Sequence, residues 1–213
     1  TALFSALEVI ANHVQMTYYY LFIILFMIIA YLVSAIREKK LAQFAKATAV
    51  CAAGGLIGIC MNISNLYHTW EYSQESMRGK SELVKANSAN QTSSGLDRDY
   101  ITQWSYGIDE TWTLLVPNAK GGASEPLTRN ETAMKKADPN FMPVYQQIGQ
   151  YWGDQPGTSG PVYVGAFVCM LFILGLFIVK GPMKWALLAA TILSVLLSWG
   201  RNFMPFTDFF LDY

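Results

Sequence analysis

The sequence predicts a mostly α-helical, polytopic membrane protein with four transmembrane helices, an interfacial N-terminal helix and a large extracytoplasmic loop of mixed structure. Three observations predict this class. Of the 213 residues, 53% are hydrophobic and only 14% are charged, which is a more apolar composition than soluble domains have. The apolar residues gather in four segments. The polar residues gather mainly in one long stretch between the second and third of these segments.

The first apolar segments predict an interfacial helix followed by a span. Residues 1–16 are apolar with a polar end, which favours a helix lying at the membrane interface. Residues 17–36 carry no charge, and a 20-residue helix at about 1.5 Å per residue crosses a hydrocarbon core of roughly 30 Å. Tyr18, Tyr19 and Tyr20 form an aromatic belt where this span begins.

A second span is expected at residues 47–65, after a basic loop at 37–46. Gly54 and Gly58 lie in this span at the spacing that permits close helix approach. The polar stretch at 66–160 follows as the extracytoplasmic loop.

The third and fourth spans are predicted at residues 161–179 and 185–199, joined by a basic turn at 180–184. The tail at 200–213 is aromatic. Excess Lys and Arg in short loops marks the cytoplasmic face. The loop, the His13 region and the tail are therefore expected together on the opposite face.

Several function classes are excluded by charge and by cysteine spacing. The net charge is zero and no basic stripe is present, so a nucleic-acid partner is not expected. Cys51, Cys60 and Cys169 lie inside apolar segments and lack zinc-like spacing. Neither a disulfide framework nor a protein-held metal is predicted.

Two carboxylates of the loop are candidates for acid–base work or sugar binding. Glu110 and Asp154 are flanked by aromatic residues, including Trp112 and Trp152. Aromatic faces stack on the C–H face of a sugar ring, while carboxylates bond its hydroxyls. The alternative is that these two tryptophans and Trp104 form a small core of the loop, and this alternative is favoured for each tryptophan taken singly.

Basic residues and one histidine are further candidates. Arg78 and Arg98 could clamp a lipid-linked phosphate, because guanidinium groups bind phosphate at two points. The alternative for each arginine is a salt bridge to a neighbouring acid. His13, with Gln15, could carry a proton or contact phosphate, or it could be an interfacial histidine bonded to its neighbours.

The order of several short strings resembles the YfhO family of bacterial membrane proteins, in the form seen in Bacteroidota. The resemblance extends over essentially the whole chain. It is carried by Asn12-His13-Val14-Gln15, Arg78-Gly79-Lys80-Ser81-Glu82-Leu83, Gly95-Leu96-Asp97-Arg98-Asp99-Tyr100, Trp104-Ser105-Tyr106-Gly107 with Glu110, Leu115-Val116-Pro117-Asn118 with Gly121-Gly122, and Tyr151-Trp152-Gly153-Asp154-Gln155-Pro156.

The resemblance implies the central section of a GT-C-type glycosyltransferase in the bacterial inner membrane. Such enzymes use polyprenyl-phosphate sugars on the outer face, among membrane lipid and the remaining helices of a longer parent protein. The acidic motif that GT-C enzymes carry in their first outer loop would lie before Thr1. We therefore expect an isolated 213-residue piece to be inactive.

The expected reaction moves a sugar from the lipid phosphate to a cell-envelope acceptor. A carboxylate would deprotonate the acceptor hydroxyl, while Arg or Lys, with a divalent cation if the enzyme uses one, would stabilise the departing phosphate. The catalytic candidates are Glu110, Asp154 and His13, and the substrate-binding candidates are Gln15, Arg78, Arg98, Trp104 and Trp152. Two alternatives remain: a transporter or flippase of lipid-linked sugars, and a non-catalytic envelope assembly factor whose loop binds proteins.

Overall fold

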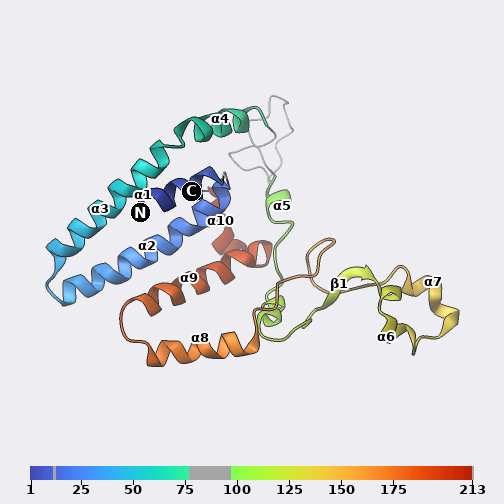
Figure 1. Ribbon diagram of the computed structural model, residues 1–213. Coiled ribbons are helices and arrows are strands. Elements are labelled where there is room, and N and C mark those ends of the chain that lie inside the picture. The colour runs from blue at the N-terminus through green and yellow to red at the C-terminus, as the bar shows by residue number, and fades with distance from the viewer. Residues whose placement is uncertain (12, 77–96, 213) are drawn as a thin grey trace. The chain divides into compact units, whose positions relative to one another are not determined.

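The computed structural model describes residues 1–11, 13–76 and 97–212 (Figure 1). These residues are mostly helical, as predicted. The chain divides into two compact units. The first unit comprises Thr1–Leu96 and Ile178–Leu193, and the second comprises Asp97–Phe177 and Ser194–Tyr213.

Two helices of the first unit are long and apolar enough to cross a membrane, which confirms the membrane class. They are α2 (Val14–Arg37) and α3 (Leu41–Cys60). Helix α2 begins slightly before the predicted span at 17–36. Helix α3 begins earlier than the predicted start at residue 47, because Lys and Gln are good helix formers and do not interrupt it.

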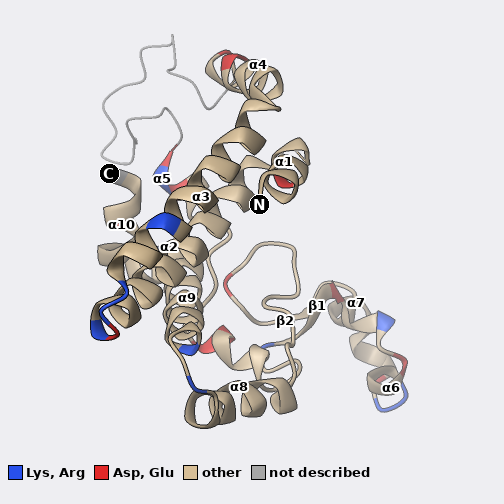
Figure 2. Ribbon diagram, turned by 60° about the vertical axis from the view of Figure 1, so that its left-hand side comes forward, with Lys and Arg blue, Asp and Glu red and all other residues tan. Residues whose placement is uncertain are grey.

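The basic loop between these helices is shorter than predicted. Only Glu38, Lys39 and Lys40 separate α2 from α3, and Lys39 adopts φ +55° to make the turn. Figure 2 shows Lys and Arg gathered around this turn. Lys40 bonds Glu38 at 2.9 Å, and this contact holds the pKa of the Glu38 carboxyl below its ordinary value.

The remaining helices of the first unit include a short N-terminal helix and an extension of α3. Helix α1 (Ala2–Ile10) packs on α3 (Figure 1). Helix α4 (Ile63–Gln74) follows α3 after a break at residues 61–62. Helix α4 therefore continues past residue 65, the predicted end of the second span, into the stretch predicted as the loop.

Glycine makes the contact between α1 and α3 possible. A Cβ atom on Gly58 would lie 2.7 Å from the Ser5 side chain and 2.8 Å from the Ala2 carbonyl oxygen. Asn62 secures the same contact, because its Nδ2 donates to the carbonyl oxygens of Ala6 at 3.1 Å and Gly58 at 3.2 Å. The glycine spacing read in the sequence therefore serves the docking of the N-terminal helix.

Residues 97–165 of the second unit form only short elements. Its helical turns are α5 (Arg98–Ile101), η1 (Asp109–Leu114), η2 (Leu127–Arg129), α6 (Glu131–Met134), η3 (Pro139–Phe141) and α7 (Met142–Tyr145). Strands β1 (Gly121–Pro126) and β2 (Gly149–Tyr151) pair antiparallel, with Gly121 opposite Tyr151 and an irregularity before Pro126. Residues 97–160 therefore combine helical turns with a two-stranded sheet.

The third and fourth predicted spans are short helices in the structure. Helix α8 (Ala166–Ile178) has 13 residues, and α9 (Met183–Ser198) has 16. At about 1.5 Å per residue, both are shorter than the roughly 30 Å of a hydrocarbon core. Pro161 and Gly165, at φ +116°, precede α8, which begins five residues later than the predicted span.

A sharp bend follows α9. Helices α9 and α10 (Met204–Asp212), joined by the helical turn η4 (Gly200–Phe203), meet at 108°. Gly200 adopts φ +39°, and a Cβ there would lie 1.9 Å from the Ser105 hydroxyl oxygen. Over the described residues the structure has two membrane-length apolar helices, or three if the bent pair is one span. The count of four stays a prediction.

We expect Gly58→Leu to weaken the docking of α1 on α3, because the new side chain meets backbone atoms. Overpacking of this kind costs about 1–3 kcal/mol. Thermal unfolding in detergent measures the effect. Gly55→Leu is the matched control, since a Cβ at Gly55 meets nothing within 4 Å. Equal melting temperatures for the two variants would contradict the packing described here.

Candidate functional site

The candidate site of the second unit is organised around Glu110. This residue lies in the helical turn η1 and its relative exposure is 0%. It has the largest fully buried side chain among the described residues. Burial of a carboxylate is costly unless hydrogen-bond donors surround it.

Three donors converge on the Glu110 carboxylate. The Gly107 N–H donates to Oε2 at 2.5 Å, and the Asp154 N–H donates to the same oxygen at 3.3 Å. The Tyr151 hydroxyl donates to Oε1. The donors come from two segments more than 40 residues apart, so Glu110 ties these segments together.

Glycines make room for this carboxylate. A Cβ on Gly153 would lie 2.1 Å from Glu110 Oε1 and 2.2 Å from the Tyr151 hydroxyl oxygen. A Cβ on Gly160 would lie 2.8 Å from the same Oε1. Both positions therefore require glycine for steric reasons, and Gly160, at φ +68°, also requires it for its backbone conformation.

Tyr151, at the end of β2, is the side chain that closes the cluster. Burial and the hydrogen bond to Glu110 raise the pKa of Tyr151 to about 12. The Gln155 N–H donates to the Tyr151 hydroxyl oxygen at 3.1 Å. Tyr151 therefore acts as a neutral donor to Glu110 and an acceptor from Gln155.

Two residues after α9 join the outer part of the cluster. Asn202 Nδ2 donates to the Tyr106 carbonyl oxygen at 2.8 Å and to Asp154 Oδ2 at 3.1 Å. Arg201 Nη2 donates to the Asp154 carbonyl oxygen at 2.8 Å. The Asp154 side chain is exposed, so its carboxylate remains open to solvent while Glu110 does not.

An open groove of about 390 Å³ runs beside these residues. It is lined by Gly107, Ile108, Asp109, Trp112, Asp154 and Asn202. Lys120 forms an ion pair with Asp109, which holds the pKa of Asp109 below its ordinary value and raises the pKa of Lys120. The groove thus presents two carboxylates, an amide and an indole ring.

The tryptophans do not form a core in the loop. Trp104, Trp112 and Trp152 are 57%, 62% and 70% exposed. The alternative favoured for each of them from the sequence, a small aromatic core, is therefore wrong. Apart from Gly107, Pro161 and Gly200, the buried residues of this unit are polar: Thr102, Ser105, Glu110 and Thr113.

The structure brings together only part of the predicted site. Glu110 and Asp154 are adjacent, as their hydrogen bond shows. Arg98 forms an ion pair with Asp208. Arg98 therefore makes a salt bridge, the alternative to phosphate binding, although the acid is distant in sequence and not a neighbour. Arg78 lies outside the described residues.

His13 and Gln15 belong to the first unit. His13 precedes α2 and is exposed, and its carbonyl oxygen accepts from the Met16 N–H at 2.9 Å. Gln15 Nε2 donates to the Tyr19 hydroxyl at 3.1 Å. Their predicted roles stay predictions.

Sequence reasoning did not identify Asn202, Arg201 or the hydrogen bond from Tyr151 to Glu110. Two features of the sequence could have pointed to them. Arg201 and Asn202 directly follow an apolar segment, and Gly153 and Gly160 lie within and just after the Tyr-Trp-Gly-Asp string. Within the described ranges, no group of three or more His, Cys, Asp or Glu residues is arranged to hold a metal ion.

Comparison with known proteins leaves the family open. No protein-family model, curated protein or solved structure matches the sequence.

We expect the stability of the second unit to fall between about pH 10 and pH 12. Tyr151 has its pKa raised from 10.0 to about 12 in the folded protein. As the pH rises, the phenol ionises at a lower pH in the unfolded chain than in the folded protein. The contribution of Tyr151 to the free energy of unfolding is therefore complete below pH 10 and is lost as the pH rises through about 12. The difference in phenolate absorbance between wild type and Tyr151→Phe measures the titration. Tyr145→Phe controls for loss of a tyrosine, and a Tyr151 titration near pH 10 would contradict the contact.

Gly153→Ala is expected to destabilise the second unit by about 1–3 kcal/mol, because the added methyl group overlaps Glu110 and Tyr151. Denaturant unfolding followed by tryptophan fluorescence measures the loss. Gly122→Ala is the control, since its Cβ would make ordinary contacts at 3.6 Å. If both variants unfold together with wild type, the tight cluster does not exist in solution.

Proposed function

We propose that the second unit binds the sugar of a polyprenyl-phosphate-linked donor, within a GT-C-like membrane glycosyltransferase of the YfhO type. The observation that carries the proposal is the groove beside Glu110, which combines carboxylates, an amide and an exposed indole. Carbohydrate recognition uses these groups, because hydroxyls bond to carboxylates and amides while the ring face packs on an aromatic side chain.

The two predicted carboxylates have different roles in this proposal. Glu110 is fully buried and is satisfied by its three donors, so it acts as a positioning residue for the groove wall. Asp154 is exposed at the groove and is oriented by Asn202. Asp154 is therefore the carboxylate proposed to contact a hydroxyl of the donor sugar or to accept the proton of the acceptor hydroxyl.

Trp112 is the proposed stacking residue. It lines the groove and is 62% exposed, whereas Trp104 and Trp152 do not line it. Trp112 therefore replaces Trp104 and Trp152, the tryptophans that the sequence analysis gave as substrate-binding candidates, as the proposed stacking residue. Phosphate binding remains assigned to Arg78, because Arg98 is engaged by Asp208. Arg201, beside Asp154, is a further basic group next to the groove.

The exposed tryptophans also support a second candidate, a non-catalytic assembly factor. Trp104 and Trp152 are 57% and 70% exposed, and aromatic residues are enriched at protein interfaces. In this case Trp152→Ala would change the proteins that co-purify, and envelope glycans would be unchanged by Asp154→Asn.

The test is binding and transfer with the full-length protein in nanodiscs, using a panel of polyprenyl-phosphate sugars. We expect Trp112→Ala and Asp154→Asn each to weaken donor binding about tenfold or more, since each removes one stacking or charge-assisted contact. Trp70→Ala is the matched control, because Trp70 is 59% exposed but belongs to the first unit. Unchanged binding in both groove variants would reject the proposed sugar site.

A further inference from the structure

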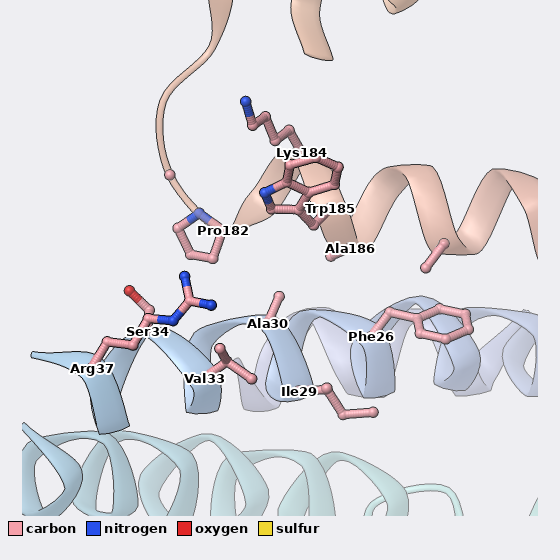
Figure 3. A pocket seen from close by; sticks show the side chains of 12 residues that line it. Phe26, Ile29, Ala30, Val33, Ser34, Arg37, Pro182, Lys184, Trp185 and Ala186 are labelled. Atoms are coloured by element: carbon pink, nitrogen blue, oxygen red, sulfur yellow. The ribbon is translucent and has the colours of Figure 1, made fainter. Parts of the chain in front are cut away.

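The first unit contains a second cavity, separate from the proposed sugar site. A groove of about 640 Å³ lies between the C-terminal half of α2 and the start of α9 (Figure 3). Small side chains line it on both helices, namely Ala30 on α2 and Ala186 and Ala189 on α9.

One end of the groove is polar and basic. Arg37, Ser34 and Lys184 line it there, together with Trp185. Figure 3 shows the Arg37 guanidinium extending from α2 toward Pro182, whereas the Lys184 side chain runs past Trp185 and away from α2. The Lys184 ammonium lies 5.1 Å from the centre of the Trp185 ring.

No acidic residue among the described ones lines the groove. The nearest acid in sequence, Glu38, is paired with Lys40 at 2.9 Å, and it accepts from the Ser34 hydroxyl at 3.1 Å. Its charge is thus balanced by Lys40. The polar end therefore carries a positive potential that suits an anion.

The other end of the groove is apolar and runs along α2 through Val33, Ile29 and Phe26. From Phe26 to Arg37 the helix rises by roughly 16 Å at about 1.5 Å per residue. This length corresponds to about half of the roughly 30 Å hydrocarbon core, that is, to one leaflet. Because Arg37 ends a membrane-length helix, the basic end lies at headgroup level and the apolar end at acyl-chain level.

We propose that this groove binds one anionic phospholipid. Arg37 contacts the phosphate, Lys184 raises the local positive potential, and one acyl chain lies along α2 past Val33 and Ile29. Basic pockets between transmembrane helices bind anionic headgroups on these physical grounds. The cationic end of the groove continues into an apolar trough about as long as one leaflet. This favours a lipid over a free phosphate, because a free phosphate has no acyl chain to fill the trough.

The test uses the full-length protein reconstituted in vesicles of equal phosphatidylglycerol and phosphatidylcholine, then extracted gently and examined by native mass spectrometry. Wild type is expected to retain phosphatidylglycerol in preference. Arg37→Gln should reduce that retention about fivefold, and Lys184→Gln should reduce it less. Lys46→Gln is the control, because Lys46 is a basic residue of the same unit that does not line the groove.

A second variant tests the apolar part. Ala30→Phe fills the trough while leaving both cations in place, and it should also lose phosphatidylglycerol. Equal retention of the two lipids by wild type would overturn the proposal, as would normal retention by Arg37→Gln. The proposal would also be overturned if Ala30→Phe lowered thermal stability but kept the lipid, because this would indicate that another helix fills the trough.

Discussion

Burial of the Glu110 carboxylate is the constraint on which the second unit depends. An ionisable group that loses water must recover hydrogen bonds from protein donors, and leaving it unpaired costs several kcal/mol. The donors here are Gly107, Tyr151 and Asp154. The chain from residue 104 to 114 and the chain from 149 to 160 must therefore run side by side, and the glycines between them must remain glycines.

This polar centre explains how a unit of short elements holds together. The buried hydrophobic residues among those described are Ala6, Val9, Ala35 and Ala186, and all four lie in the first unit. The second unit is held instead by hydrogen bonds from residues far apart in sequence, such as Trp199 Nε1 to the Thr111 hydroxyl at 2.9 Å. Directional bonds fix the groove walls precisely enough to orient Asp154 and Asn202.

The first unit is held together differently from the second. Its long helices expose most of their large apolar side chains, and such surfaces are covered by lipid or by further helices in a membrane. Close contact occurs where glycine allows it, as between α1 and Gly58. Between α2 and α9, where Ala30 and Ala189 are small, a groove remains.

The sequence by itself determined the helical membrane class and the first two spans to within about a turn or two, because apolar runs are local patterns. It also singled out Glu110 and Asp154 as candidates, because acids flanked by aromatic residues are local patterns too. It did not determine the lengths of α8 and α9 or the 108° bend, which depend on Gly165 and Gly200 in their tertiary contacts. Only the tertiary structure decided that Glu110 is buried and Asp154 exposed. Burial and hydrogen-bond partners arise between segments distant in the chain, and no local pattern encodes them.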